Sequence, residues 1–178
     1  MSIYYSKDMN AYFSRIPPFP VALVGVLVFL LYQTVDLSGE RHVVGFRDGA
    51  HFYGPLFQYV FAELRDGRLP LWNPYENLGQ PLAANPTTML LYPGTWLALS
   101  AAFLGCPIPT AYTLFVAGHF LLAMTTCYRL ARTWHRSKQA ATLAALCYVL
   151  AGNILFQWNN VPFLIGAAWF PEALGRRT

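Results

Sequence analysis

The sequence predicts an all-α integral membrane protein, with about four transmembrane helices and an external loop that carries two juxtamembrane helices. The 178 residues are 56% hydrophobic and only 11% charged, whereas soluble domains carry about 25% charged residues. Apolar runs near the roughly 20 residues that a bilayer core requires recur along the chain. The stretch from Arg47 to Pro93 is instead polar and rich in Trp, Asn, Pro and Gly. We expect one membrane domain over residues 1–178.

The first predicted element is a transmembrane helix at 19–37, after a cytoplasmic N-terminus at 1–18. A cleaved signal peptide is the alternative interpretation of this apolar run. The run is long for a signal peptide, and no small-x-small cleavage pattern follows it. We therefore expect an uncleaved membrane anchor.

Residues 38–109 are predicted to form the external loop, because acidic residues and arginines nearly balance there and no positive bias holds it in the cytoplasm. Within it, Tyr53, Phe57, Val60 and Leu64 recur at helical spacing, which predicts an amphipathic juxtamembrane helix at about 54–66. A soluble-type helix packed on a neighbouring domain is the alternative. Residues 69–85 hold too many Pro, Gly and Asn for regular structure and predict an ordered irregular loop.

A second juxtamembrane helix is expected at about 89–104. This segment is apolar enough to span, although Pro93-Gly94 interrupts it. If it crossed the membrane, the cationic segment after the next span would lie opposite the basic N-terminus, against the positive-inside rule. We therefore predict a re-entrant or interfacial helix.

The remaining spans are predicted at 110–130, 139–158 and 161–174, with a cytoplasmic loop at 131–138. Much of the net charge of +4 gathers around that loop, in Arg129, Arg132, Arg136 and Lys138. This placement is typical of a cytoplasmic loop, so no nucleic-acid partner is expected. The predicted location is the cell membrane, as a multi-pass protein with the 38–109 loop on the outer face.

No metal or cofactor motif is present in the sequence. Cys127 and Cys147 lie in apolar runs and Cys106 in a turn, so their spacing fits no disulfide or metal framework. Walker, dinucleotide-binding and serine-hydrolase motifs are also missing. We predict no cofactor and no metal ligands. Binding of a divalent metal is the open alternative, and no residues in the sequence support it.

Asp48 is the candidate catalytic residue. It lies between the first span and the predicted surface helix, where a carboxylate could take a proton from an incoming hydroxyl. A helix N-cap is the structural alternative. The neighbouring candidate substrate-binding residues are Arg47, His51 and Tyr53.

The loop after this helix supplies further candidates for binding substrate. Trp72 and Tyr75 could stack on a sugar face, while Asn73 and Asn85 could hydrogen-bond its hydroxyls. The alternative is a rigid turn whose aromatic residues anchor it at the lipid headgroups. Glu76 is interpreted as a carboxylate in a solvated turn.

His119 lies in the middle of the second span, where an ionisable residue is a functional hypothesis by default. The alternative is a neutral imidazole hydrogen-bonded to a neighbouring helix. A transporter with His119 as its proton-handling group is therefore one competing function, and a non-catalytic membrane subunit with a docking loop is another.

The order of motifs resembles the bacterial YfhO-like membrane proteins, within the GT-C superfamily of integral-membrane glycosyltransferases. An Asp after the first span is followed by 68-RLPLWNPY-75, Gly79-x-Pro81, 83-AAN-85 and 91-LYP-93, then by Gly152-Asn153 and 167-AAWFP-171. The resemblance covers nearly the whole chain after residue 17. It extends only to the N-terminal portion of the family, so we expect this chain to be a fragment that is inactive alone.

The resemblance implies transfer of a sugar from a polyprenyl-phosphate donor to an acceptor hydroxyl on the outer face of the membrane. The implied partners are membrane lipid, the polyprenyl-phosphate-linked sugar, and a glycan, polymer or protein acceptor of the cell envelope. Asp48 matches the loop Asp that serves as general base or orients the acceptor in the family.

Overall fold

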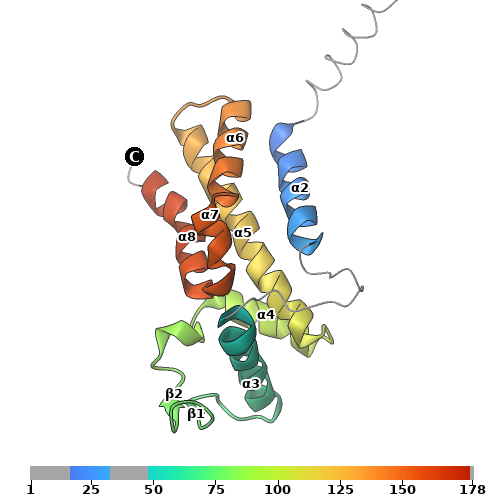
Figure 1. The fold of residues 1–178 in the computed structure, drawn as a ribbon, viewed down its shortest axis with the longest axis vertical. Helices are drawn as coiled ribbons and strands as arrows, with labels where there is room; N and C mark the ends of the chain where they lie inside the picture. Colours follow the sequence, from blue (N-terminus) through green and yellow to red (C-terminus); the bar gives the residue numbers. More distant parts are fainter. Residues whose placement is uncertain (1–16, 33–47, 177–178) are drawn as a thin grey trace, which may run out of the picture.

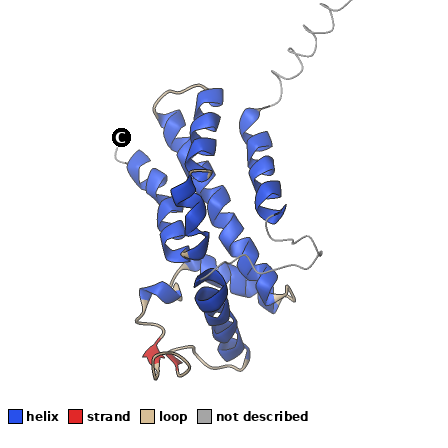
Figure 2. Cartoon of the chain, viewed as in Figure 1, coloured by secondary structure: helices blue, strands red, loops and turns tan. Residues whose placement is uncertain are grey.

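The computed structural model describes residues 17–32 and 48–176. Within these ranges the chain is mostly helical and has little strand, which confirms the all-α prediction. Figure 2 shows that the strands form one small hairpin, with loops around it and between the helices. In Figure 1, long helices stand side by side, with shorter helices and the hairpin gathered at one end.

The central element is α5 (Ile108–Thr133), which packs against α6 and α8. Pro109 suits its first turn because the missing N–H would have no intrahelical acceptor there. Its 26 residues extend roughly 39 Å at about 1.5 Å per residue, more than the core of a bilayer at about 30 Å. Among the described residues, α5 is the single continuous helix whose length and hydropathy suffice to cross a membrane. The 110–130 prediction is confirmed as a helix.

The prediction of one continuous helix at 139–158 is wrong. The structure has α6 (Lys138–Val149), a break at Leu150-Ala151, then α7 (Gly152–Phe156) and a 3-10 turn (Gln157–Asn159). The two halves are bent by 45° and together are long and apolar enough to cross a membrane. Ala151 is extended, with ψ 137, and Gly152 follows it, a residue that disfavours helix interiors. Periodicity does not reveal a bend within a uniformly apolar run.

Two shorter apolar helices flank this core. The first, α2 (Pro18–Tyr32), packs on α5 and α6, and the Phe19 ring stacks on Tyr128 with centroids 4.1 Å apart. The second, α8 (Val161–Gly175), packs on α5, where Thr126 donates a hydrogen bond of 2.8 Å to the Ala168 carbonyl. The end of the predicted 19–37 span lies outside the described residues.

Both predicted juxtamembrane segments contain helices. The first, α3 (Gly54–Arg65), matches the predicted 54–66 within a residue. The second, α4, runs only from Pro93 to Phe103, so the predicted start at residue 89 is wrong. Met89 adopts a left-handed conformation with φ 53 after a 3-10 turn at Pro86–Thr88, and no α-helix passes through such a residue. Pro93 begins the helix where it was expected to interrupt one.

Candidate functional site

The segment before α3 is a π-helix, Gly49–Tyr53, in which the Gly54 N–H bonds to the Gly49 carbonyl. Short π-helical segments are rare and occur frequently at functional sites. Asp48 immediately precedes it, with helical φ and ψ angles, an exposed side chain and no capping hydrogen bond. The N-cap interpretation therefore has no hydrogen bond to support it.

Tyr53 ends this segment and ties it to the helical bundle. Its ring is buried, and its hydroxyl donates a 3.2 Å hydrogen bond to Asn160 Oδ1, just before α8. Burial raises the pKa of Tyr53, and the nearby charge of Asp48 raises it further. Tyr53 therefore stays neutral and acts as a donor that fixes the start of α3.

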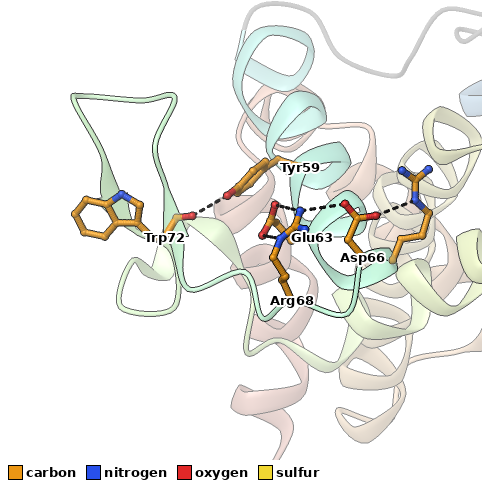
Figure 3. Close-up of polar contacts among 6 residues, drawn as sticks. Tyr59, Glu63, Asp66, Arg68 and Trp72 are labelled. Carbon is orange, nitrogen blue, oxygen red and sulfur yellow. Dashed lines mark hydrogen bonds and ion pairs between the residues drawn. The ribbon is translucent and has the colours of Figure 1, made fainter.

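The end of α3 is held by ion pairs, drawn in Figure 3. Arg68 donates two 2.9 Å hydrogen bonds to the Glu63 carboxylate and one of 3.0 Å to Asp66. The hydrogen bonds from Arg68 lower the pKa of Glu63. Gly67, with φ +75, reverses the direction of the chain between Asp66 and Arg68. This arrangement turns the chain back along α3 toward the loop.

A hydrogen bond of 2.8 Å from the Tyr59 hydroxyl to the Trp72 carbonyl then joins the loop to α3 (Figure 3). Burial raises the pKa of Tyr59, with a further contribution from Glu63. At Trp72 the loop becomes a two-residue antiparallel ladder, β1 (Trp72–Asn73) with β2 (Gln80–Pro81). The expectation of an irregular loop at 69–85 missed this ladder.

Gly79 allows the hairpin to close. Its φ is +106, and a Cβ at this position would lie 2.5 Å from Cζ2 of Trp72. The indole ring therefore covers the Gly79 backbone, so Trp72 braces the hairpin.

Replacing Gly79 with Ala is expected to open the hairpin, because left-handed strain of about 1–3 kcal/mol adds to the collision with the Trp72 ring. Gly67→Ala is the matched control, since Gly67 also has positive φ but a Cβ added there would meet nothing within 4 Å. Limited proteolysis should cut residues 69–85 faster in Gly79→Ala than in Gly67→Ala. Equal rates would contradict the role assigned to the ring.

The turn within the hairpin is organised by side-chain hydrogen bonds. Asn73 Oδ1 accepts from the Tyr75 N–H at 3.0 Å, an Asx turn. Glu76 Oε2 accepts from Gln80 Nε2 at 2.6 Å and from Asn73 Nδ2 at 3.3 Å. Glu76 lies in a turn between exposed neighbours, as expected, but its side chain is half-buried and held by the two amides.

Between this turn and the π-helical segment lies a pocket of about 380 Å³, within the range of ligand sites. Of the predicted substrate-binding residues, His51, Asn73 and Tyr75 line it. The Tyr59 and Tyr75 rings meet edge to face, with centroids 5.7 Å apart. Among the described residues, the lining consists of His51, Phe52, Pro55, Leu56, Tyr59, Asn73, Tyr75 and Glu76.

The other predicted site residues that the structure describes are not part of the pocket lining. Asp48 precedes His51 by three residues, about one turn of a helix. Asn85 caps the Pro86–Thr88 turn by accepting from the Thr87 N–H at 3.0 Å, and it lines a different pocket with Tyr92 and Ile165. Arg47 lies outside the described residues.

Phe52, Tyr59 and Glu76 line the pocket but were not predicted as site residues. Tyr59 faces the pocket from within α3, and Phe52 precedes that helix. Glu76 follows Asn73 by three residues. An amide and a carboxylate at that spacing in a turn can hydrogen-bond to each other, and this pattern could have predicted Glu76 as a site residue.

His119 occupies a separate, hydrogen-bonded position on α5. Its Nδ1 lies 2.6 Å from the Phe115 carbonyl and therefore donates, and its Nε2 lies 2.8 Å from the Tyr92 hydroxyl. Trp169 Nε1 in turn donates to the Tyr92 oxygen at 3.0 Å. Both ring nitrogens of His119 have partners, which favours the structural interpretation of this residue.

Among residues 17–32 and 48–176, no three His, Cys, Asp or Glu side chains cluster to hold a metal ion. Comparison of the chain with protein families, curated proteins and solved structures gave no match in any of the three.

Proposed function

We propose that this protein is a membrane glycosyltransferase, or the N-terminal part of one, which moves a sugar from a polyprenyl-phosphate donor to an acceptor hydroxyl at the outer face of the membrane. The observation that carries the proposal is the pocket beside α3. Three predicted substrate-binding residues line this pocket: His51 from the segment before α3, and Asn73 and Tyr75 from the hairpin. Aromatic walls and a few oriented polar groups are the usual composition of such a site.

Asp48 supplies the proposed chemistry. Its carboxylate takes the proton from the acceptor hydroxyl while that oxygen attacks the anomeric carbon, and polyprenyl phosphate leaves with the bonding electrons. The exposed side chain has no capping role to give up. A base at a water-facing edge is accessible to a large acceptor.

The proposal includes four membrane crossings: α2, α5, the bent α6–α7 pair and α8. The start of α2, the loop between α5 and α6, and the end of α8 lie at one end of the bundle, and α3 with the hairpin lies at the other (Figure 1). The first end carries Arg129, Arg132, Arg136 and Lys138, so we place it in the cytoplasm.

Cysteine labelling tests this orientation. In a variant without Cys106, Cys127 and Cys147, a single cysteine at Asn77 should react with a membrane-impermeant maleimide added to intact cells. A cysteine at His135 should react only after the membrane is opened. Both positions are exposed, so the reverse pattern would contradict both the orientation and the position of the site.

Glycosyl transfer itself tests the function. Membranes from the native host, with and without the gene, would be supplied with polyprenyl-phosphate sugars that carry a labelled sugar. We expect loss of label transfer to one envelope acceptor when the gene is deleted, and its return when the gene is restored. Unchanged transfer with every donor would contradict the proposal.

A non-catalytic docking role is the second candidate, and the exposed aliphatic residues of the loop favour it. Leu69, Leu71 and Leu78 are all exposed, and Leu78 has a positive φ of 62. Under this alternative, Leu78→Ser disrupts a complex while Asp48→Asn leaves function intact. Under the glycosyltransferase proposal, Asp48→Asn has the larger effect.

A further inference from the structure

The pocket beside α3 has a marked asymmetry of charge. Glu76 contributes a carboxylate and His51 an imidazole, and no Lys or Arg is among the described residues that line the pocket. The nearby Arg68 is engaged with Glu63 and Asp66. The pocket therefore favours a neutral or positively charged group over a phosphate.

The charge of Glu76 is oriented but not neutralised. Its two hydrogen bonds come from the neutral amides of Asn73 and Gln80, and both reach Oε2. Within the described part of the chain Glu76 forms no ion pair, and Oε1 accepts no hydrogen bond. A half-buried carboxylate of this kind can still bind a cationic donor.

Aromatic rings supply the rest of the wall. Tyr59 and Tyr75 stand at 84° to each other with centroids 5.7 Å apart, and Phe52 also lines the pocket. Ring faces attract a cation within about 6 Å of the centroid. Aromatic faces bind organic cations, and a carboxylate adds a charge-assisted hydrogen bond from an ammonium N–H.

We propose that this pocket binds a primary ammonium group, and that the sugar which it selects is an amino sugar. This inference rests on the proposed glycosyltransferase function and adds the substrate class. An ethanolamine headgroup carries the same ammonium chemistry, so the test must separate the two sources.

Binding would be measured by ligand-observed NMR on the full chain purified in detergent, at a pH below the pKa of the sugar amine. The probes are glucosamine, glucose, glucose 1-phosphate and glycerophosphoethanolamine. We expect glucosamine to bind about tenfold more tightly than glucose, which corresponds to one strong charged contact, and glucose 1-phosphate to bind more weakly than glucose.

Glu76→Gln should reduce the preference for glucosamine to within about twofold, because glutamine can still accept from Gln80 and Asn73 and so preserves the turn. Tyr75→Ala, at an exposed ring, should also reduce it. Glu172→Gln is the matched control, since Glu172 pairs with Arg129 and Arg176 on α8, and it should keep the preference.

The outcomes separate the two proposals. Equal binding of glucose and glucosamine, or a preference that persists in Glu76→Gln, would overturn the ammonium site and leave the glycosyltransferase proposal standing. Binding of glycerophosphoethanolamine alone would support the ammonium site as a lipid headgroup site and overturn the selection of an amino sugar. Binding of none of the probes would overturn the ammonium site, and the glycosyl-transfer experiment described above would then decide the proposed function by itself.

Discussion

Replacing Asp48 with Asn is expected to lower the rate of glycosyl transfer by about 10²–10⁴, the usual contribution of a general base. The change keeps the size of the side chain and removes its negative charge and basicity. It would be introduced in the chromosomal gene, so that anything that acts with this chain is present, and transfer would be measured at matched protein levels.

The structure sharpens this test by removing a competing explanation. Loss of an N-cap would cost about 1 kcal/mol, but Asp48 has helical backbone angles and caps nothing. The variant should therefore fold and unfold as the native protein does. A thermal midpoint equal to that of the native chain would show that the lost activity is chemical.

A second carboxylate provides the control for Asp48. Glu76 lines the pocket and is therefore unsuitable. Glu172→Gln makes the corresponding change on α8, outside the residues that line the pocket. Near-normal transfer by Asp48→Asn, or an equal loss in Glu172→Gln, would contradict the assignment.

Elements set by local signals were predictable from the sequence. Apolar residues at helical spacing, with Pro55 in the first turn and Asp66-Gly67 at the end, located α3 within a residue. The long uninterrupted run at 110–130 located α5, whose ends the structure extends to Ile108 and Thr133. These signals lie within a few residues of the features they predict.

Features that depend on contacts between distant residues were not predictable. A proline at residue 93 is compatible with either a break in a helix or the start of one. In the structure it starts α4, because the left-handed Met89 prevents a helix from running through residue 89. The pocket needs the Tyr59–Trp72 hydrogen bond to bring the hairpin against α3. Asn73 and Tyr75 could be recognised as sugar-binding residue types. The orientation of the Glu76 carboxylate could not be predicted, because it depends on the hydrogen bonds formed within the folded turn.

The hydrogen-bonded chain from Trp169 through Tyr92 to His119 is the second place where one substitution should have a large effect. It links α8, the residue before α4, and α5 through a single hydroxyl. Because the Phe115 carbonyl accepts from Nδ1, a neutral His119 ring accepts the Tyr92 proton at Nε2. The Tyr92 oxygen then accepts from Trp169. Each of the three donors in this series of hydrogen bonds therefore has one acceptor.

Tyr92→Phe removes that hydroxyl and leaves two former partners without it. His119 is only 6% exposed, so its Nε2 loses a bond that water does not readily replace. A buried polar group left unsatisfied costs about 1–3 kcal/mol, which lowers the thermal midpoint by about 2–4 °C per kcal/mol in a chain of this size. Thermal unfolding in detergent measures this shift.

Tyr148→Phe is the matched control for Tyr92→Phe, because the Tyr148 hydroxyl donates one 2.8 Å bond to the Ala167 carbonyl and accepts none that the structure records within the described residues. It should cost only about 0.5–1.5 kcal/mol, the net value of a single hydrogen bond. The double variant Tyr92→Phe/His119→Leu should lose less than the sum of its parts, because it no longer buries a His119 Nε2 without a partner. Strict additivity, or equal losses in Tyr92→Phe and Tyr148→Phe, would show that these hydrogen bonds do not couple α5 and α8 through Tyr92.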